Sequence, residues 1–143
     1  DAGAKFIVAP NLNDKVAECC AKNSLAYFPG ALTPTEIEKA WCSGATMVKV
    51  FPASQMGPSY FKMLKGPFEH IKLMAVGGVS PQNIPDYFSA GASAVALGGS
   101  IFSQRRMANQ DYGSIQKDIE EFIFAVNKNY SKIRSSDFAN HPN

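Results

Sequence analysis

The side chain best placed for chemistry in this 143-residue chain is a lysine inside an apolar segment. Lys49 lies in the run TMVKVF, residues Thr46–Phe51, near its C-terminal end. An apolar pocket disfavours a charged ammonium group and favours the neutral amine. A neutral amine is what attack on a carbonyl carbon and Schiff-base formation require. The alternative is an ordinary strand lysine that reaches solvent or pairs with a carboxylate.

Two glycine-rich turns are the second candidate feature. Each turn follows an apolar run and precedes the start of a helix, and glycines allow a ligand to approach the backbone closely. The free N–H groups and the dipole of a helix N-terminus attract phosphate. The alternative is a tight strand-to-helix turn that binds nothing. The residues concerned are Gly77, Gly78, Gly98, Gly99 and Ser100.

These residues have to be positioned by alternating strands and helices. Short apolar runs predict strands at Lys5–Ala9, Leu25–Phe28, Thr46–Phe51, Ile71–Val76 and Ala92–Leu97. Helical patterns predict helices at Asp14–Asn23, Pro34–Cys42, Pro58–Lys65, Pro81–Ala90 and Asp111–Tyr130. Such alternation is typical of right-handed βαβ units and a parallel sheet covered on both faces. A doubly wound sheet and a (β/α)8 barrel both fit, and in each the loops that follow the strands meet at one edge.

The composition restricts the function classes. Hydrophobic residues make up 45% and charged residues 18% of the chain, which is typical of a globular domain. A net charge of +2 with interspersed signs gives no case for nucleic acid, and no apolar run approaches the roughly 20 residues of a membrane span. Three cysteines, an odd number, favour a reducing compartment and a cytoplasmic location. His70 and His141 have no metal-like partners in the sequence, so no metal site is predicted.

The start of the chain suggests that more protein precedes it. The sequence opens at Asp1 without Met, and its first residues read as the end of a helix that leads into a strand. We therefore expect upstream residues, including any organellar targeting segment. Residues 1–133 are assigned to the C-terminal part of one domain, and residues 134–143 to a polar, flexible tail.

Several segments together resemble one enzyme family. The segments are DAGAKFIVAPNL (1–12), YFPGALTPTE (27–36), VKVFPAS around Lys49, MAVGGVSPQN (74–83) and GASAVALGGSIF (91–102). With these segments in this order, the chain is similar over roughly residues 1–130 to the 2-keto-3-deoxy-6-phosphogluconate / 4-hydroxy-2-oxoglutarate aldolases. The first segment, residues 1–12, resembles that family's fourth strand and its approach.

The resemblance implies the last five β-α units, strands four to eight, of a (β/α)8 TIM barrel that forms a homotrimer. It implies a class I aldolase, a lyase of Entner–Doudoroff-type carbohydrate metabolism, with no metal or organic cofactor. The implied reaction is reversible cleavage of a phosphorylated 2-keto-3-deoxy sugar acid, of gluconate or galactonate type, to pyruvate and glyceraldehyde 3-phosphate. 4-Hydroxy-2-oxoglutarate is a further substrate of the family.

The resemblance also assigns roles to residues. Lys49 matches the Schiff-base lysine, and the two glycine turns match the phosphate-binding ends of strands seven and eight. Pro10 and Phe51 match positions that line the substrate pocket. Val76 stands where many members have a threonine whose hydroxyl helps to distinguish the epimers, and the galactonate-type relatives resemble this chain there.

One departure concerns residues that the chain lacks. The family's first three strands carry a glutamate that shuttles protons, and an arginine and a threonine that hold the substrate carboxylate. The chain alone is therefore expected to be inactive, unless a carboxylate such as Glu36 serves as the shuttle. Two other readings stay open: a phosphate-binding barrel enzyme of the thiamine-phosphate or tryptophan-pathway type, and a non-catalytic fragment that binds phosphorylated sugars.

Overall fold

The computed structural model describes the backbone of residues 3–139 and side chains through Asn129. The strands are β1 (Phe6–Val8), β2 (Ala26–Phe28), β3 (Gly30–Ala31), β4 (Val48–Val50), β5 (Leu73–Val76) and β6 (Ala94–Ala96). The helices are α1 (Asp14–Lys22), α2 (Pro34–Cys42), α3 (Ala53–Lys65), α4 (Ile84–Ser89), α5 (Gln104–Ala108) and α6 (Tyr112–Ala139).

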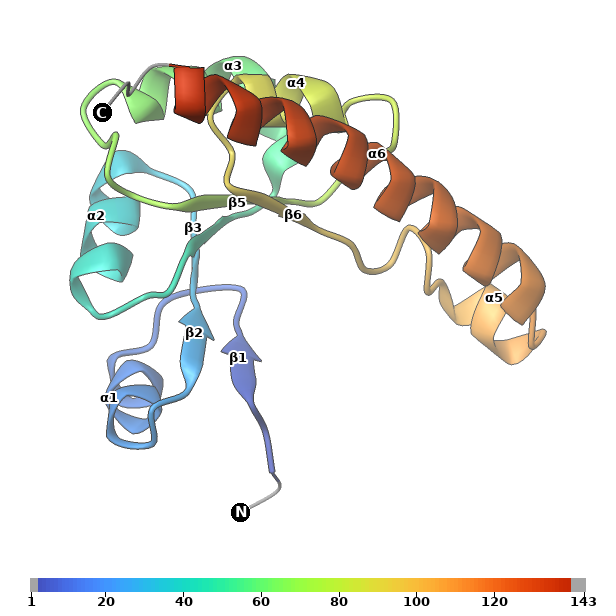
Figure 1. The fold of residues 1–143 in the computed structure, drawn as a ribbon. Coiled ribbons are helices and arrows are strands. Elements are labelled where there is room, and N and C mark those ends of the chain that lie inside the picture. Colours follow the sequence, from blue (N-terminus) through green and yellow to red (C-terminus); the bar gives the residue numbers. More distant parts are fainter. Residues whose placement is uncertain (1–2, 140–143) are drawn as a thin grey trace.

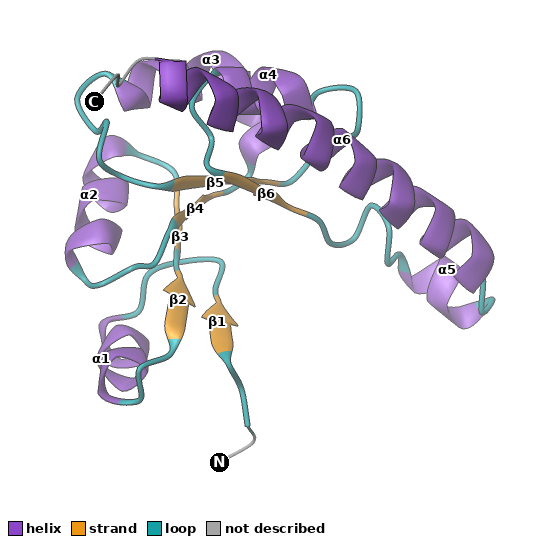
Figure 2. Ribbon diagram, viewed as in Figure 1, coloured by secondary structure: helices purple, strands orange, loops and turns teal. Residues whose placement is uncertain are grey.

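The strands form one parallel succession. β1 pairs with β2, and β3, β4, β5 and β6 are neighbours in that order, all in parallel. Only Pro29 separates β2 from β3, and its carbonyl accepts the N–H of Lys49 at 2.9 Å. β2 and β3 are therefore one strand in two parts, and it continues past the predicted end at Phe28. The predicted α/β class with β-α repeats is confirmed (Figures 1 and 2).

Capping residues fix where the early helices begin. Asn13 caps α1 by accepting the N–H groups of Lys15 and Val16. Thr33 and Glu36 form the predicted capping box at the start of α2, so both N-terminal N–H groups of that turn have acceptors.

Two helices begin several residues away from the predicted positions. α3 starts at Ala53, because Pro58 opens only its second segment, after a break at Gly57 where φ is 71°. α4 starts at Ile84 instead of Pro81, because Asn83 Oδ1 accepts the N–H of Ser80 and closes a turn there.

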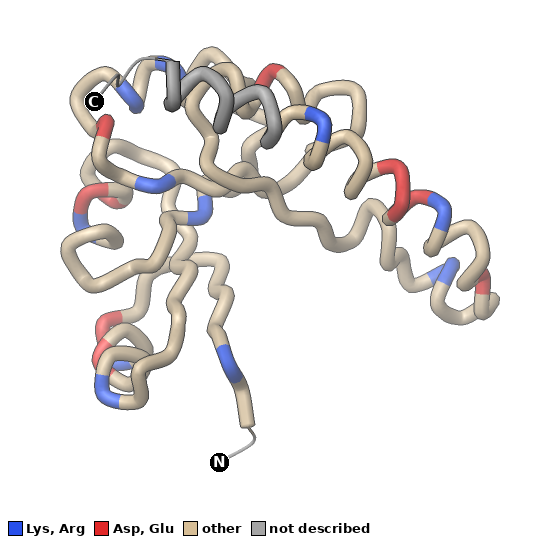
Figure 3. Tube along the Cα trace, in the orientation of Figure 1, with Lys and Arg blue, Asp and Glu red and all other residues tan. Residues whose placement is uncertain are grey.

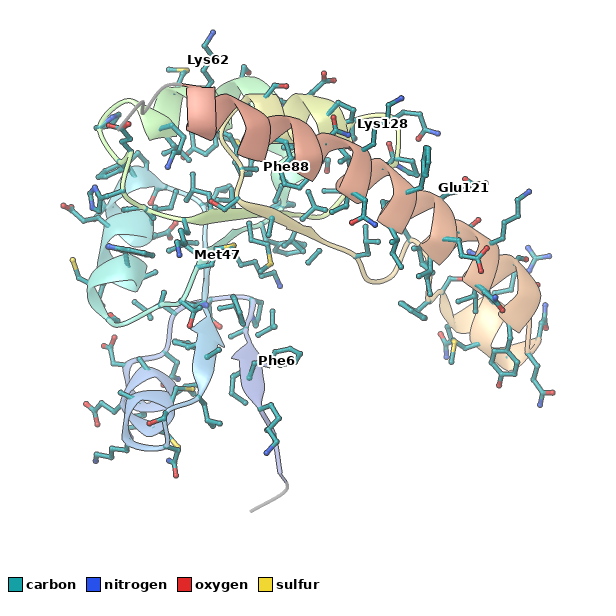
Figure 4. All side chains as sticks on the ribbon, viewed as in Figure 1. Phe6, Met47, Lys62, Phe88, Glu121 and Lys128 are labelled. Carbon is teal, nitrogen blue, oxygen red and sulfur yellow. The ribbon has the colours of Figure 1, made fainter. Side chains whose placement is uncertain are left out.

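Helices α1 to α4 lie on the convex side of the curved strands, and α4 packs between α3 and α6 (Figure 1). The core fills this convex side: the side chains of Val48, Val50, Leu73 and Ala75 are fully buried. In Figure 4 Lys62 on α3 points away from the sheet, whereas Phe6 extends from β1 on the side away from α1. The concave side therefore keeps exposed apolar groups.

The C-terminal helix α6 continues through Ala139, beyond the predicted end at Tyr130. The flexibility expected of residues 134–143 stays a prediction, and residues 140–143 lie outside the described part of the chain. Along the trace in Figure 3, positions of Lys and Arg are interspersed with positions of Asp and Glu over the described helices and loops. No helix in the described part of the chain is both long and apolar enough to cross a membrane.

Candidate active site

A cavity of about 470 Å³ lies at the C-terminal ends of β4, β5 and β6. Parallel strands present their C-terminal ends at one edge, which is where α/β proteins place their ligands. Eight of the nine predicted site residues line this cavity. They are Lys49, Phe51, Val76, Gly77, Gly78, Gly98, Gly99 and Ser100.

Lys49 reaches this cavity because side chains alternate along a strand. Its neighbours Val48 and Val50 are buried among the helices, so Lys49 points to the concave side. Its Nζ lies 4.9 Å from the centre of the Phe51 ring, a cation–π distance. Among the described residues no carboxylate forms an ion pair with it. The amine is therefore half-buried beside an aromatic wall without a fixed counter-charge.

The first glycine turn interlocks with the turn that follows Lys49. Gly77 and Gly78 have φ of 92° and 73°, a region that favours glycine. A Cβ on Gly77 would lie 3.2 Å from the Phe51 ring, and a Cβ on Gly78 would overlap the Ser54 side chain. The N–H of Ser54 donates to the Gly77 carbonyl at 3.0 Å. The first glycine turn is therefore packed against, and hydrogen-bonded to, the segment that follows Lys49.

The second glycine turn follows β6 and leaves its backbone open. No heavy atom lies within 4 Å of a Cβ added to Gly98 or Gly99. In the described part of the chain, no acceptor takes the backbone N–H groups of Gly78, Gly99 or Ser100, and the Ser100 hydroxyl has no partner either. Unsatisfied N–H groups at the ends of two neighbouring strands are the donors that an anion needs.

Lys49 is the only ionisable residue among those that line the cavity. Glu36 is committed elsewhere, because its carboxylate accepts the N–H groups of Thr33 at 2.7 Å and Leu32 at 2.9 Å. These two bonds hold the pKa of Glu36 below its usual value. A proton shuttle near neutral pH needs a higher pKa, so Glu36 is poorly suited to that role. In the described residues no group of three His, Cys, Asp or Glu side chains could hold a metal ion.

Pro10 is the one predicted pocket residue that does not line the cavity. It follows β1, and its carbonyl packs so closely on Gly30 that a Cβ there would collide with it. Sequence reasoning did not single out Val8, Val79, Ala96 and Leu97, which do line the cavity. Ala96 lies opposite Val76 in the parallel pairing of β5 and β6, and the pattern of residue types does not show this register.

The family model and the curated relatives indicate one family. The sequence model of the family described as "Aldolase: KDPG and KHG aldolase" matches residues 1–118. The chain is 36% identical over 101 residues to 2-dehydro-3-deoxy-6-phosphogalactonate aldolase of Escherichia coli K12. The matched region covers 70% of this chain and 49% of that protein. It is 34% identical over 124 residues to 2-dehydro-3-deoxy-phosphogluconate aldolase of Haemophilus influenzae, covering 85% and 58%.

A solved structure shows the same arrangement of strands and helices. The native KDPGal structure superposes with a TM-score of 0.82 at 30% identity, covering 90% of this chain and 61% of that one. The chain spans about half the length of the curated relatives that it matches, 49% and 58% in the two cases above.

Proposed function

We propose that this chain, which belongs to the KDPG and KHG aldolase family, carries the imine-forming lysine and the phosphate site of a class I aldolase. Its substrate would be a 2-keto-3-deoxy-6-phospho sugar acid, cleaved reversibly to pyruvate and glyceraldehyde 3-phosphate. The observation that supports this most is the single cavity that joins Lys49 to the open backbone of the second glycine turn.

Lys49 supplies the covalent step. Its neutral amine adds to the C2 carbonyl of the keto acid, and loss of water from the carbinolamine leaves an imine. Protonation of the imine nitrogen makes an electron sink. The C4 hydroxyl then loses its proton as the C3–C4 bond breaks, and the bond electrons move into an enamine. Glyceraldehyde 3-phosphate leaves, the enamine takes a proton at C3, and water releases pyruvate and the free amine.

The glycine turns hold the other end of the substrate. A phosphate at the second turn accepts hydrogen bonds from the N–H groups of Gly99 and Ser100 and from the Ser100 hydroxyl. The N–H of Gly78 reaches the same region from the neighbouring strand end, since all three residues line one cavity. Charge-assisted bonds from backbone N–H groups to a phosphate fix the register of the substrate against Lys49.

The proton-transfer group is proposed to come from outside residues 1–143. The reaction moves protons at the hydroxyl, at C3 and at the carbinolamine, and each step needs an acid or base within reach. The cavity lining offers none besides Lys49. A longer chain that completes the barrel, and assembles as a trimer, would supply the shuttle and the carboxylate-binding groups that the family resemblance implies.

The apolar Val76 points to weak selection between the epimers. A hydroxyl that bonds to a substrate hydroxyl discriminates strongly between epimers, whereas an aliphatic wall discriminates little. The identities to a phosphogalactonate aldolase, 36%, and to a phosphogluconate aldolase, 34%, are similar, so the argument on the epimers rests on Val76. We propose that the galactonate epimer is cleaved at least as well as the gluconate epimer.

Two other functions would use the same phosphate site. A barrel enzyme of the thiamine-phosphate or tryptophan-pathway type needs no amine in this position, and a non-catalytic phosphosugar-binding protein needs no covalent step. The half-buried Lys49 without an ion-pair partner among the described residues favours the aldolase over both.

A cleavage assay on the full-length gene product separates these functions. Pyruvate release is followed with lactate dehydrogenase for the gluconate epimer, the galactonate epimer and 4-hydroxy-2-oxoglutarate. We expect pyruvate from both epimers with the wild type and none above background with Lys49→Met or Lys49→Arg, because a guanidinium stays protonated. Equal turnover by Lys49→Met would exclude the proposal.

A further inference from the structure

The second glycine turn, residues 98–100, is held by hydrogen bonds within its own backbone and by one arginine. The N–H groups of Ile101 and Phe102 both donate to the Gly98 carbonyl at 3.0 Å, which curls the turn around that oxygen. The Ile101 side chain is buried in the core. Ile101 therefore anchors the C-terminal end of the turn in the core, and its carbonyl oxygen is held in a fixed position.

Arg106 on α5 contacts the Ile101 carbonyl directly. Its Nη1 donates to the Ile101 carbonyl at 3.3 Å and contacts Asp118 Oδ2 on α6 at 2.6 Å. Its Nε lies 3.7 Å from Asp111, where α6 begins. The arginine side chain is only 21% exposed, so the group is held in place. One guanidinium thus connects the turn, α5 and the N-terminal end of α6, which lie together in Figure 1.

The position of Asp118 gives this contact an electrostatic consequence. Asp118 lines a second cavity, of about 230 Å³, together with Ser100 and Ile101. A carboxylate in the cavity beside Ser100 repels a phosphate bound at that residue unless its charge is compensated. Glu121 also lines this cavity, and of the two carboxylates Asp118 is the one that forms an ion pair among the described residues. Arg106 supplies that compensation through a direct, partly buried ion pair.

We propose that Arg106 is a positioning residue for phosphate recognition, acting through the Ile101 carbonyl and by neutralising Asp118. The inference rests on the proposed aldolase function, because it concerns the phosphate half of that site. Arg106 is not among the residues that line the substrate cavity. It therefore acts on the substrate only through the turn and through the local charge.

The test compares two neighbouring arginines in the full-length gene product. Arg106→Gln removes the guanidinium that contacts the Ile101 carbonyl and leaves the negative charge of Asp118 without its arginine partner. Arg105→Gln makes the same charge change on an exposed residue of the same helix. Three quantities are measured: KM for the phosphorylated keto acid, the inhibition constant of inorganic phosphate, and the rate at which borohydride traps pyruvate.

Arg106→Gln should raise both phosphate-dependent constants roughly tenfold, with pyruvate trapping unchanged within about twofold. Arg105→Gln should change none of the three by more than about twofold. Adding Asp118→Asn to Arg106→Gln should recover part of the lost phosphate affinity, because the repelling charge is gone.

Three results would overturn the inference. One is equal behaviour of the two arginine variants. Another is a fall in pyruvate trapping as large as the loss of phosphate affinity, which would show a general structural role. The third is no recovery in the Arg106→Gln/Asp118→Asn double variant. A wild type that inorganic phosphate does not inhibit would overturn the phosphate site of the proposed function as well.

Discussion

The two faces of the curved sheet differ although they are made from the same strands. On the convex face, Val48 and Val50 are completely buried under the helices. On the concave face, Phe6, Val8 and Phe51 are 59%, 47% and 43% exposed. Lys49 belongs to the concave face although it stands between the two buried valines. Residues adjacent in sequence therefore serve stability on one side and the proposed chemistry on the other.

This difference explains why a stable core and an unfinished site can coexist. The convex face is covered by segments that the chain itself contains. The concave face leaves large apolar groups open to water, which is unfavourable at about 25 cal/mol per Å² of apolar area. The two outer strands, β1 and β6, each have one unpaired edge among the described strands. Completion of the concave face by further protein would remove both costs.

The largest expected effect comes from leaving the concave face open. The isolated 143-residue chain should release pyruvate at least about a hundredfold more slowly than the full-length gene product, because Lys49 is the only ionisable residue that lines its cavity and the proposed proton shuttle lies outside the chain. The comparison uses equal concentrations and the coupled pyruvate assay, with circular dichroism to check folding. Full turnover by the isolated chain would contradict the comparison and would assign the shuttle to a carboxylate within it, such as Glu36.

The second prediction compares how much one truncated side chain on each face lowers the free energy of unfolding. Leu73→Ala on the convex face should lower the free energy of unfolding by about 2–5 kcal/mol, because it opens a cavity in a fully buried site. Val8→Ala on the concave face should cost less than about 1 kcal/mol, since Val8 is 47% exposed. Urea unfolding of the isolated 143-residue chain measures both, because the exposure of Val8 is that of this chain. A larger loss for Val8→Ala would show that the concave face is the better packed one.

The phosphate end of the concave face can be tested by charge. Gly99→Asp should weaken turnover of the phosphorylated substrate roughly a hundredfold, through bulk and like-charge repulsion. Gly99→Ala is the matched control, because the space around that Cβ is open. 4-Hydroxy-2-oxoglutarate, which lacks phosphate, should be affected far less. An equal loss of kcat/KM on both substrates would place the phosphate elsewhere.

The smallest effect concerns selectivity. Val76→Thr should shift the ratio of kcat/KM toward the gluconate epimer by about tenfold, because the new hydroxyl can bond to the substrate. Stability should change little, since Val76 is only half-buried. An unchanged ratio, together with a wild type that strongly prefers the gluconate epimer, would rule out a role for this position in epimer choice.

The sequence predicted the order of strands and helices because apolar runs and capping residues act locally. Thr33 and Glu36 formed the expected capping box at the expected residue. The start of α4 was misplaced because the Asn83 side chain closes a turn on Ser80, and such a bond does not show in the pattern of residue types. Local signals thus located the elements better than their ends.

Side-chain contacts across the fold could not be predicted in the same way. The contacts of Arg106 with the Ile101 carbonyl and with Asp118 join a turn to two helices. No spacing in the sequence indicates these contacts. Pro10 packs on Gly30 instead of lining the cavity, because the course of the chain after β1 depends on its neighbour strand. In contrast, the gathering of Lys49 with both glycine turns follows from parallel strands alone.

The most direct test of the account is to locate the covalent bond to pyruvate. The full-length protein is incubated with pyruvate, reduced with borohydride, digested and analysed by mass spectrometry. We expect one reduced pyruvate adduct on the peptide that contains Lys49, and none in Lys49→Met. Lys72→Met, which removes an exposed lysine near the opposite end of the sheet, should leave the labelling unchanged. Labelling that persists in Lys49→Met would contradict the central assignment.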